Sequence, residues 1–168
     1  MHRVSRIVDG LGVALLGVAS IAILVGVLAG TADVAGTYLF LSPVHGATEL
    51  TTELVVAIVF LSLAHVQRRR GHIRVELLYT HLGPRTQAVL DALGAAIALV
   101  FFGLLLWQGY VAALFSWQIQ ESTLSVVRIP IYPAKFSILV GVGVLMARLV
   151  IDLVASVRAA LDATPRRT

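Results

Sequence analysis

Residues 10–31, GLGVALLGVASIAILVGVLAGT, form an apolar run without a charged side chain. As a helix this run would be about 33 Å long, enough to cross the roughly 30 Å hydrocarbon core of a bilayer. A cleaved export signal has a shorter apolar region of about 7 to 15 residues, so we expect a retained membrane span. The composition agrees with a membrane protein, because 58% of the 168 residues are apolar, only 13% are charged and the mean hydropathy is +0.93.

Three further apolar runs follow, so the sequence predicts an all-α integral membrane protein with four transmembrane helices. Because these runs leave no room for a sizeable extramembrane domain, residues 1–168 are expected to form a single membrane domain. The predicted spans cover about residues 10–31, 47–67, 87–115 and 131–154.

Basic residues are distributed unevenly between the two sides of these spans. Of the 13 lysines and arginines, only Arg128 and Lys135 fall on the side of the first and third connections. Arg68, Arg69 and Arg70, directly after the second run, are expected to set the topology. Since basic segments are retained in the cytoplasm, both termini are expected to be cytoplasmic.

The connection between the second and third spans has apolar side chains at near-helical spacing. They are Ile73, Leu77, Leu78 and Leu82. Gly71 and Gly83-Pro84 bracket this segment. The pattern predicts a short amphipathic helix in the membrane plane at about 72–82, with an irregular amphipathic loop as the alternative.

Small residues and one pair of opposite charges indicate contacts between helices. Gly26 and Gly30 have the GxxxG spacing, and Gly141 thins the fourth run; such positions permit close backbone approach in lipid. Arg148 and Asp152 are four residues apart on the fourth run and are expected to pair or to reach the membrane surface.

The polar residues give little support to catalysis or to cofactor binding. Without cysteine, thiolate chemistry is excluded, and no nucleophile or phosphate-binding motif occurs, so no catalytic, cofactor or metal site is expected.

A haem-binding membrane anchor of an oxidoreductase would need facing histidines, and His65 is the only histidine well inside an apolar run. A small autonomous dimeric exporter would need a carboxylate at transport depth, for which Asp33 and Glu53 are the approximate candidates. Glu49 and Glu53 share a helix face at the membrane margin. Because two carboxylates repel each other there, they require a cation, a proton or a partner protein.

Several short motifs occur in a recognisable order. They are Glu53-Leu54, Phe-Leu-Ser-Leu-Ala at 60–64, Gly-His-Ile-Arg-Val-Glu at 71–76, Leu-Gly-Pro-Arg at 82–85, Trp-Gln-Gly-Tyr at 107–110, Glu-Ser-Thr at 121–123, Ile-Pro-Ile-Tyr-Pro-Ala-Lys at 129–135, and Gly141 in the last run. In this order, over about residues 48–155, the chain resembles the small membrane subunit (Q subunit) of tripartite ATP-independent periplasmic (TRAP) transporters.

This resemblance implies a non-catalytic small permease subunit of a sodium-coupled secondary transporter in the bacterial inner membrane. Its partners would be a large multi-span transport subunit, an extracytoplasmic substrate-binding protein and membrane lipids, with no nucleic acid. The chain would brace the large subunit and help to dock the binding protein. The candidate docking residues on the outer face are Glu49, Glu53, Glu121, Arg128 and Lys135. The candidate anchors of the in-plane helix are Gly71, His72, Arg74 and Glu76.

Overall fold

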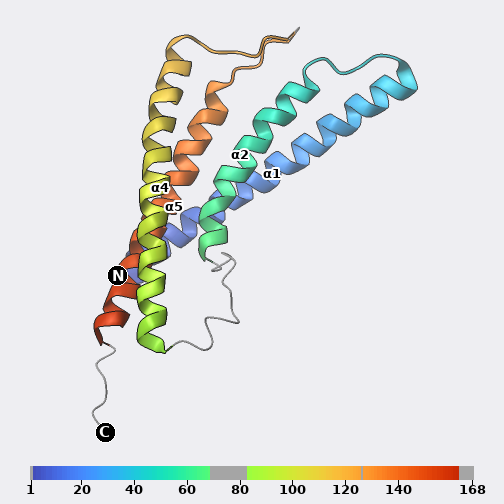
Figure 1. The fold of residues 1–168 in the computed structure, drawn as a ribbon. Helices are drawn as coiled ribbons and strands as arrows, with labels where there is room; N and C mark the ends of the chain where they lie inside the picture. The colour runs from blue at the N-terminus through green and yellow to red at the C-terminus, as the bar shows by residue number, and fades with distance from the viewer. Residues whose placement is uncertain (1, 69–82, 126, 163–168) are drawn as a thin grey trace.

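The computed structural model describes residues 2–68, 83–125 and 127–162. Its four long helices are labelled in Figure 1 as α1 (His2–Phe40), α2 (Ala47–Arg68), α4 (Pro84–Gln118) and α5 (Tyr132–Asp162). Across these described ranges there is no β-strand, only an isolated bridge between Ser122 and Pro130. The predicted all-helical fold is confirmed, and all four helices are long and apolar enough to cross a membrane. The in-plane helix predicted at 72–82 lies outside the described residues.

Helix α1 is much longer than the span predicted for it. Its 39 residues correspond to about 58 Å, against a hydrocarbon core of about 30 Å. We expected the span to end before the charge of Asp33, but the helix continues to Phe40. The Asp33 carboxylate accepts a 2.9 Å hydrogen bond from the backbone N–H of Val44, so the loop that follows the helix satisfies this charge. Figure 1 shows α1 running obliquely to α4 and α5.

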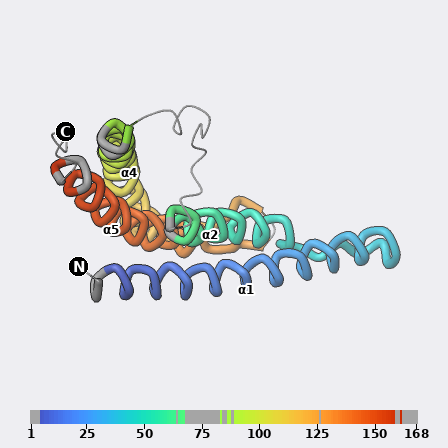
Figure 2. The backbone as a smooth tube through the Cα atoms, turned by 90° about the horizontal axis from the view of Figure 1, so that it is seen from below, coloured from blue at the N-terminus to red at the C-terminus, as the bar shows by residue number. Residues whose placement is uncertain are grey.

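The helices form an open row and not a closed four-helix bundle. Helix α1 packs along α2, α2 along α5, and α5 along α4, whereas α1 contacts α5 over a short stretch. Figure 2 shows α1 as a separate layer next to α2 and α5, with α4 on the far side of α5. Within the described part of the chain, α1 and α4 at the ends of the row therefore each keep one long side uncovered.

Side-chain burial is confined to the middle of this row. Leu145 and Leu149 of α5 form the centre of the core, with Leu63 of α2 and Phe102 of α4 packed against them. Many large apolar side chains of α1 and α4 are instead exposed. Apolar surface of this extent is not stable in water, so it belongs against lipid or against another protein.

Helices α2 and α5 cross at Gly141, where one backbone touches the other. A Cβ atom at Gly141 would overlap the carbonyl oxygen of Phe60, so only glycine fits this crossing. Gly26 in α1 has a looser contact, because a Cβ atom there would lie 3.8 Å from Leu54. A Cβ atom at Gly30 would have no neighbour within 4 Å.

Candidate functional site

The α1–α2 and α4–α5 connections lie at the same end of the helix row, as Figure 1 shows. We call this end the loop end; it comprises residues 41–46 and 119–131 together with the adjoining helix turns. The five residues predicted to form a docking face belong to this end. Two of them are in the first turns of α2, two in the α4–α5 connection, and one in the first turn of α5.

Glu121 and Lys135 form an ion pair at the loop end. The Nζ atom of Lys135 donates a hydrogen bond to Oε2 of Glu121. This bond lowers the pKa of Glu121, because the adjacent ammonium group favours the carboxylate form. The backbone N–H of Glu121 also donates to the carbonyl of Ser116 at 3.0 Å. The pair therefore joins the end of α4 to the beginning of α5.

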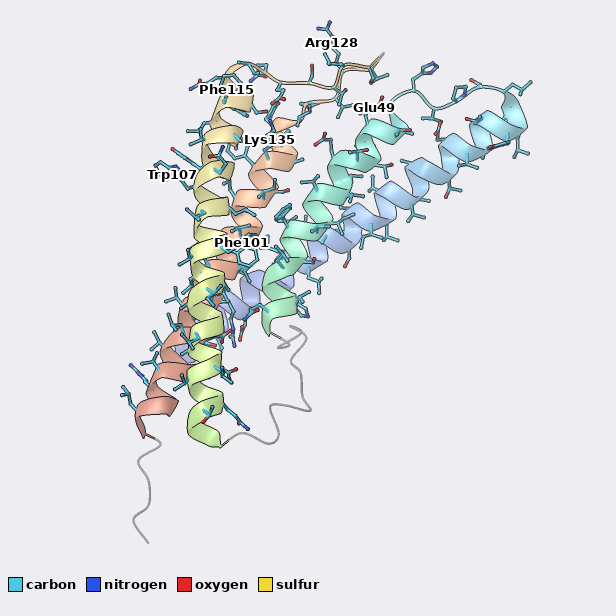
Figure 3. The ribbon with its side chains drawn as sticks, viewed as in Figure 1. Glu49, Phe101, Trp107, Phe115, Arg128 and Lys135 are labelled. Carbon is cyan, nitrogen blue, oxygen red and sulfur yellow. The ribbon has the colours of Figure 1, made fainter. Side chains whose placement is uncertain are left out.

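Aromatic side chains support the same junction. The Trp117 ring packs edge-to-face against Tyr132, with ring centroids 4.9 Å apart, and against Phe136 at 6.0 Å. Such pairs contribute about 0.5–1.5 kcal/mol beyond simple burial. Trp107, lower on α4, is 70% exposed, and Figure 3 shows it pointing away from the neighbouring helices.

The α4–α5 connection folds back on itself between residues 121 and 131, a segment that we call the hairpin. The N–H of Thr123 donates to the carbonyl of Ile129 at 2.9 Å, and the N–H of Ile131 donates to the carbonyl of Glu121 at 3.0 Å. The N–H of Ile129 donates in turn to Oγ1 of Thr123 at 3.0 Å. These bonds pair residues 121–123 with residues 129–131.

The α1–α2 connection packs against the hairpin. Gly46 has a positive φ of 89°, which favours glycine, and a Cβ atom there would lie only 3.1 Å from Cβ of Val127. At the end of α1, the N–H of Ser42 donates to the carbonyl of Gly36, and a Cβ atom at Gly36 would lie 2.6 Å from the Ser42 carbonyl oxygen. The two connections thus approach closely at Gly46, and Gly36 permits the tight turn that begins the first of them.

The remaining predicted docking residues differ in their surroundings. Glu53 is half-buried in α2. Glu49, one turn earlier in α2, is also half-buried and has no ion-pair partner among the described residues. Arg128 is exposed and likewise lacks an ion-pair partner in the described ranges; Figure 3 shows it pointing away from the helices. Arg128 is therefore separate from the Glu121–Lys135 pair.

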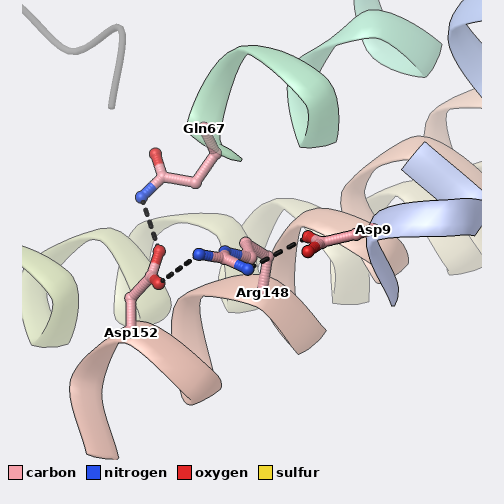
Figure 4. Close-up of polar contacts among 4 residues, drawn as sticks. All are labelled: Asp9, Gln67, Arg148 and Asp152. Atoms are coloured by element: carbon pink, nitrogen blue, oxygen red, sulfur yellow. Dashed lines mark hydrogen bonds and ion pairs between the residues drawn. The ribbon is translucent and has the colours of Figure 1, made fainter. Parts of the chain in front are cut away.

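A second polar group, the ionic cluster, consists of Asp9, Gln67, Arg148 and Asp152 (Figure 4). Nη1 of Arg148 lies 3.0 Å from Oδ1 of Asp9, and Nη2 lies 3.0 Å from Oδ1 of Asp152. Nε2 of Gln67 donates to Oδ2 of Asp152 at 3.3 Å. The Arg148–Asp152 pair was expected from its spacing and is present. Asp9 and Gln67 were missed, because they lie at the margins of other apolar runs, where spacing along the chain gives no sign of the partner.

A cavity of about 300 Å³ lies beside the ionic cluster, between α2, α4 and α5. Gly94 and Ala98 of α4 leave this space open, and Gln67, Asp91 and Asp152 supply polar lining. Both carboxylate oxygens of Asp152 already have partners in the cluster. In the described part of the chain, no group of three or more His, Cys, Asp or Glu residues could hold a metal ion.

His45 and His65 lie at opposite ends of α2. His45 is in the connection before α2, and His65 is near the opposite end of that helix. Nδ1 of His65 is buried and has no hydrogen-bond partner among the residues that the structure describes. This arrangement gives no support to the haem-anchor alternative.

Some predicted residues fall where the structure gives no description. Arg68 is the last residue of α2, and Arg69 and Arg70 lie outside the described residues. The same holds for the predicted in-plane anchors Gly71, His72, Arg74 and Glu76.

Comparison with known proteins identifies one family. Residues 26–159 match the family described as "Tripartite ATP-independent periplasmic transporters, DctQ component". Comparisons with curated proteins and with solved structures give no match. The matched range includes α2, α4, both connections at the loop end and nearly all of α5.

Proposed function

Because the chain belongs to the DctQ component family of tripartite ATP-independent periplasmic transporters, we propose that it braces the large membrane subunit of a sodium-coupled secondary transporter. It is a non-catalytic transporter component and a multi-pass membrane protein. The transporters of this family also contain a large membrane subunit and a substrate-binding protein. The proposal concerns the division of labour between these three parts.

The open row of helices is the observation that carries this proposal. A closed bundle buries its apolar faces within itself, whereas this row leaves one long side of α1 and of α4 uncovered by the described parts of the chain. Large apolar side chains occupy those sides, among them Ile97, Leu104 and Trp107 on α4. Such surfaces suit a subunit that packs against a larger membrane protein and against lipid.

The distribution of polar groups agrees with bracing and not with solute transport by this chain alone. A carrier that binds a polar solute near mid-membrane has broken helices or several polar side chains at that depth. Here α4 and α5 are continuous, and the charges of Arg148 and Asp152 in the ionic cluster are paired within it. Gln67 Oε1 and Arg148 Nε have no hydrogen-bond partner among the described residues, so the cluster keeps two unpaired polar atoms. We infer that the solute and sodium path belongs to the large subunit.

The loop end faces the outside of the cell in this proposal, and both termini are cytoplasmic in the bacterial inner membrane. Residues 1–168 act as one membrane domain, and Arg68, Arg69 and Arg70 retain their connection in the cytoplasm. Gly71, His72, Arg74 and Glu76 anchor that connection at the membrane surface. The outer face formed by Glu49, Glu53, Glu121, Arg128 and Lys135 takes part in docking the binding protein.

Bracing has a simple mechanical meaning. If the large subunit moves one domain against a fixed one, helices packed on the fixed part increase the amount of protein and lipid that would have to move with it. The close α2–α5 crossing at Gly141 and the ionic cluster keep the row rigid enough for this role. The chain thus contributes rigidity and a docking surface.

Reconstitution with and without the large subunit tests the proposal. We expect the purified chain alone to give no substrate uptake into liposomes, and the chain with its large subunit, binding protein and a sodium gradient to give uptake. The chain should also co-purify with the large subunit in mild detergent. Uptake by the chain alone, or equal uptake by the large subunit without this chain, would contradict the bracing role.

A further inference from the structure

The cavity of about 300 Å³ beside the ionic cluster lies where α2 and α4 each pack along α5 and not along each other. Its α4 side is formed by small residues, among them Gly94 and Ala98. A Cβ atom at Gly94 would meet nothing within 4 Å. The space is therefore large enough for a small chemical group, and no described side chain fills it.

The lining of this cavity supplies hydrogen-bond acceptors and, in the described part of the chain, includes no basic side chain. Asp91 and Asp152 contribute carboxylates, each of which can accept about four hydrogen bonds, so bonds made elsewhere leave capacity on both. Gln67 contributes Oε1, which is buried and has no hydrogen-bond partner among the described residues. Its amide nitrogen donates to Asp152, as Figure 4 shows, so the oxygen is turned away from that bond. A buried acceptor without a donor is costly, which indicates that a donor occupies this space.

A primary ammonium group matches this lining. It carries one positive charge and three N–H donors, which suit the two carboxylates and the Oε1 atom of Gln67. The ionic cluster has one arginine for two aspartates, Asp9 and Asp152, so it keeps a formal negative charge. A trimethylammonium group has the same charge but no N–H donor. The charge and the acceptors together therefore favour a primary ammonium group.

The cavity lies at the depth of lipid headgroups. Gln67 is near the end of α2 that is opposite the loop end. The 22 residues of α2 correspond to about 33 Å, close to the roughly 30 Å thickness of the hydrocarbon core. Because the loop end lies at one surface of the membrane, the cavity lies near the other surface.

An apolar stripe on α4 leads from the cavity toward the middle of the membrane. Leu90 lines the cavity and is 44% exposed. Ile97 and Phe101 follow Leu90 by seven and eleven residues, so they share its helix face, and both are largely exposed. Acyl chains attached to the ammonium group would lie along this stripe. A phospholipid therefore fits the surroundings of the cavity better than a soluble amine does.

We propose that this cavity binds the primary ammonium group of a phospholipid, with the chemistry of phosphatidylethanolamine, in the leaflet opposite the loop end. Gln67, Asp91 and Asp152 accept the hydrogen bonds of the ammonium group, and the stripe on α4 holds the acyl chains. This inference goes beyond the proposed bracing function and does not depend on it.

The test uses the full chain purified with its large subunit and freed of lipid in detergent. It is titrated with phosphatidylethanolamine or phosphatidylcholine of the same acyl chains, and native mass spectrometry counts the bound lipids. We expect one site that binds phosphatidylethanolamine about tenfold more tightly, since hydrogen bonds to a charged group account for a factor of that order. Gly94→Leu, which fills the cavity, and Asp91→Asn, which removes a charge and keeps the shape, should each reduce this preference to about threefold or less.

Two variants outside the cavity are the matched controls. Gly17→Leu adds the same side chain at an exposed position of α1, where a Cβ atom would meet nothing within 4 Å. Glu49→Gln removes a half-buried carboxylate at the loop end. Both should keep the preference of the wild type. All four variants should co-purify with the large subunit in unchanged amount, which shows that they are folded.

Free ethanolamine distinguishes the two sources of the ammonium group. If a large excess of ethanolamine leaves phosphatidylethanolamine bound, the acyl chains contribute and the site is a lipid site. Displacement of the lipid by ethanolamine would assign the cavity to a soluble amine and overturn the lipid part of the inference. Equal binding of the two phospholipids by the wild type, or an unchanged preference in both Gly94→Leu and Asp91→Asn, would overturn the whole inference and leave the bracing proposal standing.

Discussion

Arg148 of α5 donates a 3.0 Å hydrogen bond from Nη1 to Oδ1 of Asp9 in α1, joining residues 139 positions apart in the sequence. Its other terminal nitrogen, Nη2, pairs with Asp152, which in turn accepts a bond from Gln67 of α2. The guanidinium group therefore connects α5 to α1, and Asp152 extends the connection to α2. Because α1 contacts α5 over a short stretch, this bridge ties the beginning of α1 to the middle of α5.

Replacing Arg148 by methionine should destabilise the chain by about 2 kcal/mol. Removing one member of a fully buried ion pair costs about 3–5 kcal/mol, and the cost is smaller here because Arg148, Asp9 and Asp152 are 19%, 23% and 31% exposed. The measurement is the midpoint of thermal unfolding in detergent, with the exposed Arg6→Met as control. Adding Asp9→Asn and Asp152→Asn to Arg148→Met should restore part of the lost stability, because the two carboxylates left unpaired are then neutral. An unchanged unfolding midpoint in Arg148→Met would show that the cluster does not stabilise the fold.

Gly141→Ala should destabilise the α2–α5 crossing by about 3 kcal/mol, the upper part of the range for overpacking. The added methyl group would overlap the Phe60 carbonyl, and backbone cannot move aside as a flexible side chain can. Gly143, two residues later in α5, is the matched control, because a Cβ atom there meets nothing within 4 Å. Gly143→Ala should leave the unfolding midpoint unchanged or raise it. Equal effects of both substitutions would contradict the observed crossing.

The Glu121–Lys135 pair should make the loop end sensitive to acid. Since the fold lowers the pKa of Glu121, the bond stabilises the protein above the ordinary glutamate pKa, and this contribution is lost as the pH falls through the lowered value. The chain has two tryptophans, so in a Trp107→Phe background the fluorescence of Trp117 reports on this junction. We expect the Trp117 fluorescence to change at a pH below the ordinary glutamate range, and not to change there in the Glu121→Gln variant. A fluorescence change at or above that range in both the parent protein and the variant would exclude the ion pair as its cause.

Single cysteines can test the orientation directly, because the chain contains no natural cysteine. Leu124→Cys at the hairpin and Leu161→Cys near the end of α5 are both at exposed positions. In spheroplasts, a maleimide that does not cross membranes should label Leu124→Cys, and should label Leu161→Cys only after lysis. The opposite pattern would place both termini outside the cell.

Much of the fold could be predicted from the sequence, because a bilayer permits few solutions. Four apolar runs of sufficient length have to be helices. The spans predicted to begin at about 47 and 131 lie at the starts of α2 (Ala47) and α5 (Tyr132). Local spacing also predicted the Arg148–Asp152 pair, since residues four apart share a helix face. These features depend only on neighbours along the chain.

Features that depend on tertiary contacts were not predicted. Asp33 resembled the end of a span, yet α1 continues past it to Phe40, and the Asp33 carboxylate accepts a bond from Val44 in the loop beyond. Glu121 and Lys135 were both selected as docking residues, and their pairing with each other across the hairpin was not predicted. Nothing in the apolar pattern distinguishes an open row from a closed bundle, because lipid and a neighbouring helix favour the same side chains.

The length of α1 sets how far this chain extends within the plane of the membrane. The segment Ser5–Phe40 has 36 residues and would measure about 54 Å along its axis, of which the uncharged run 10–31 accounts for about 33 Å. If the helix leans, more of this length lies within hydrocarbon about 30 Å thick, and its two ends emerge farther apart laterally. A thicker bilayer would draw these ends together and a thinner one would spread them, so the lateral reach of this chain depends on the lipids around it.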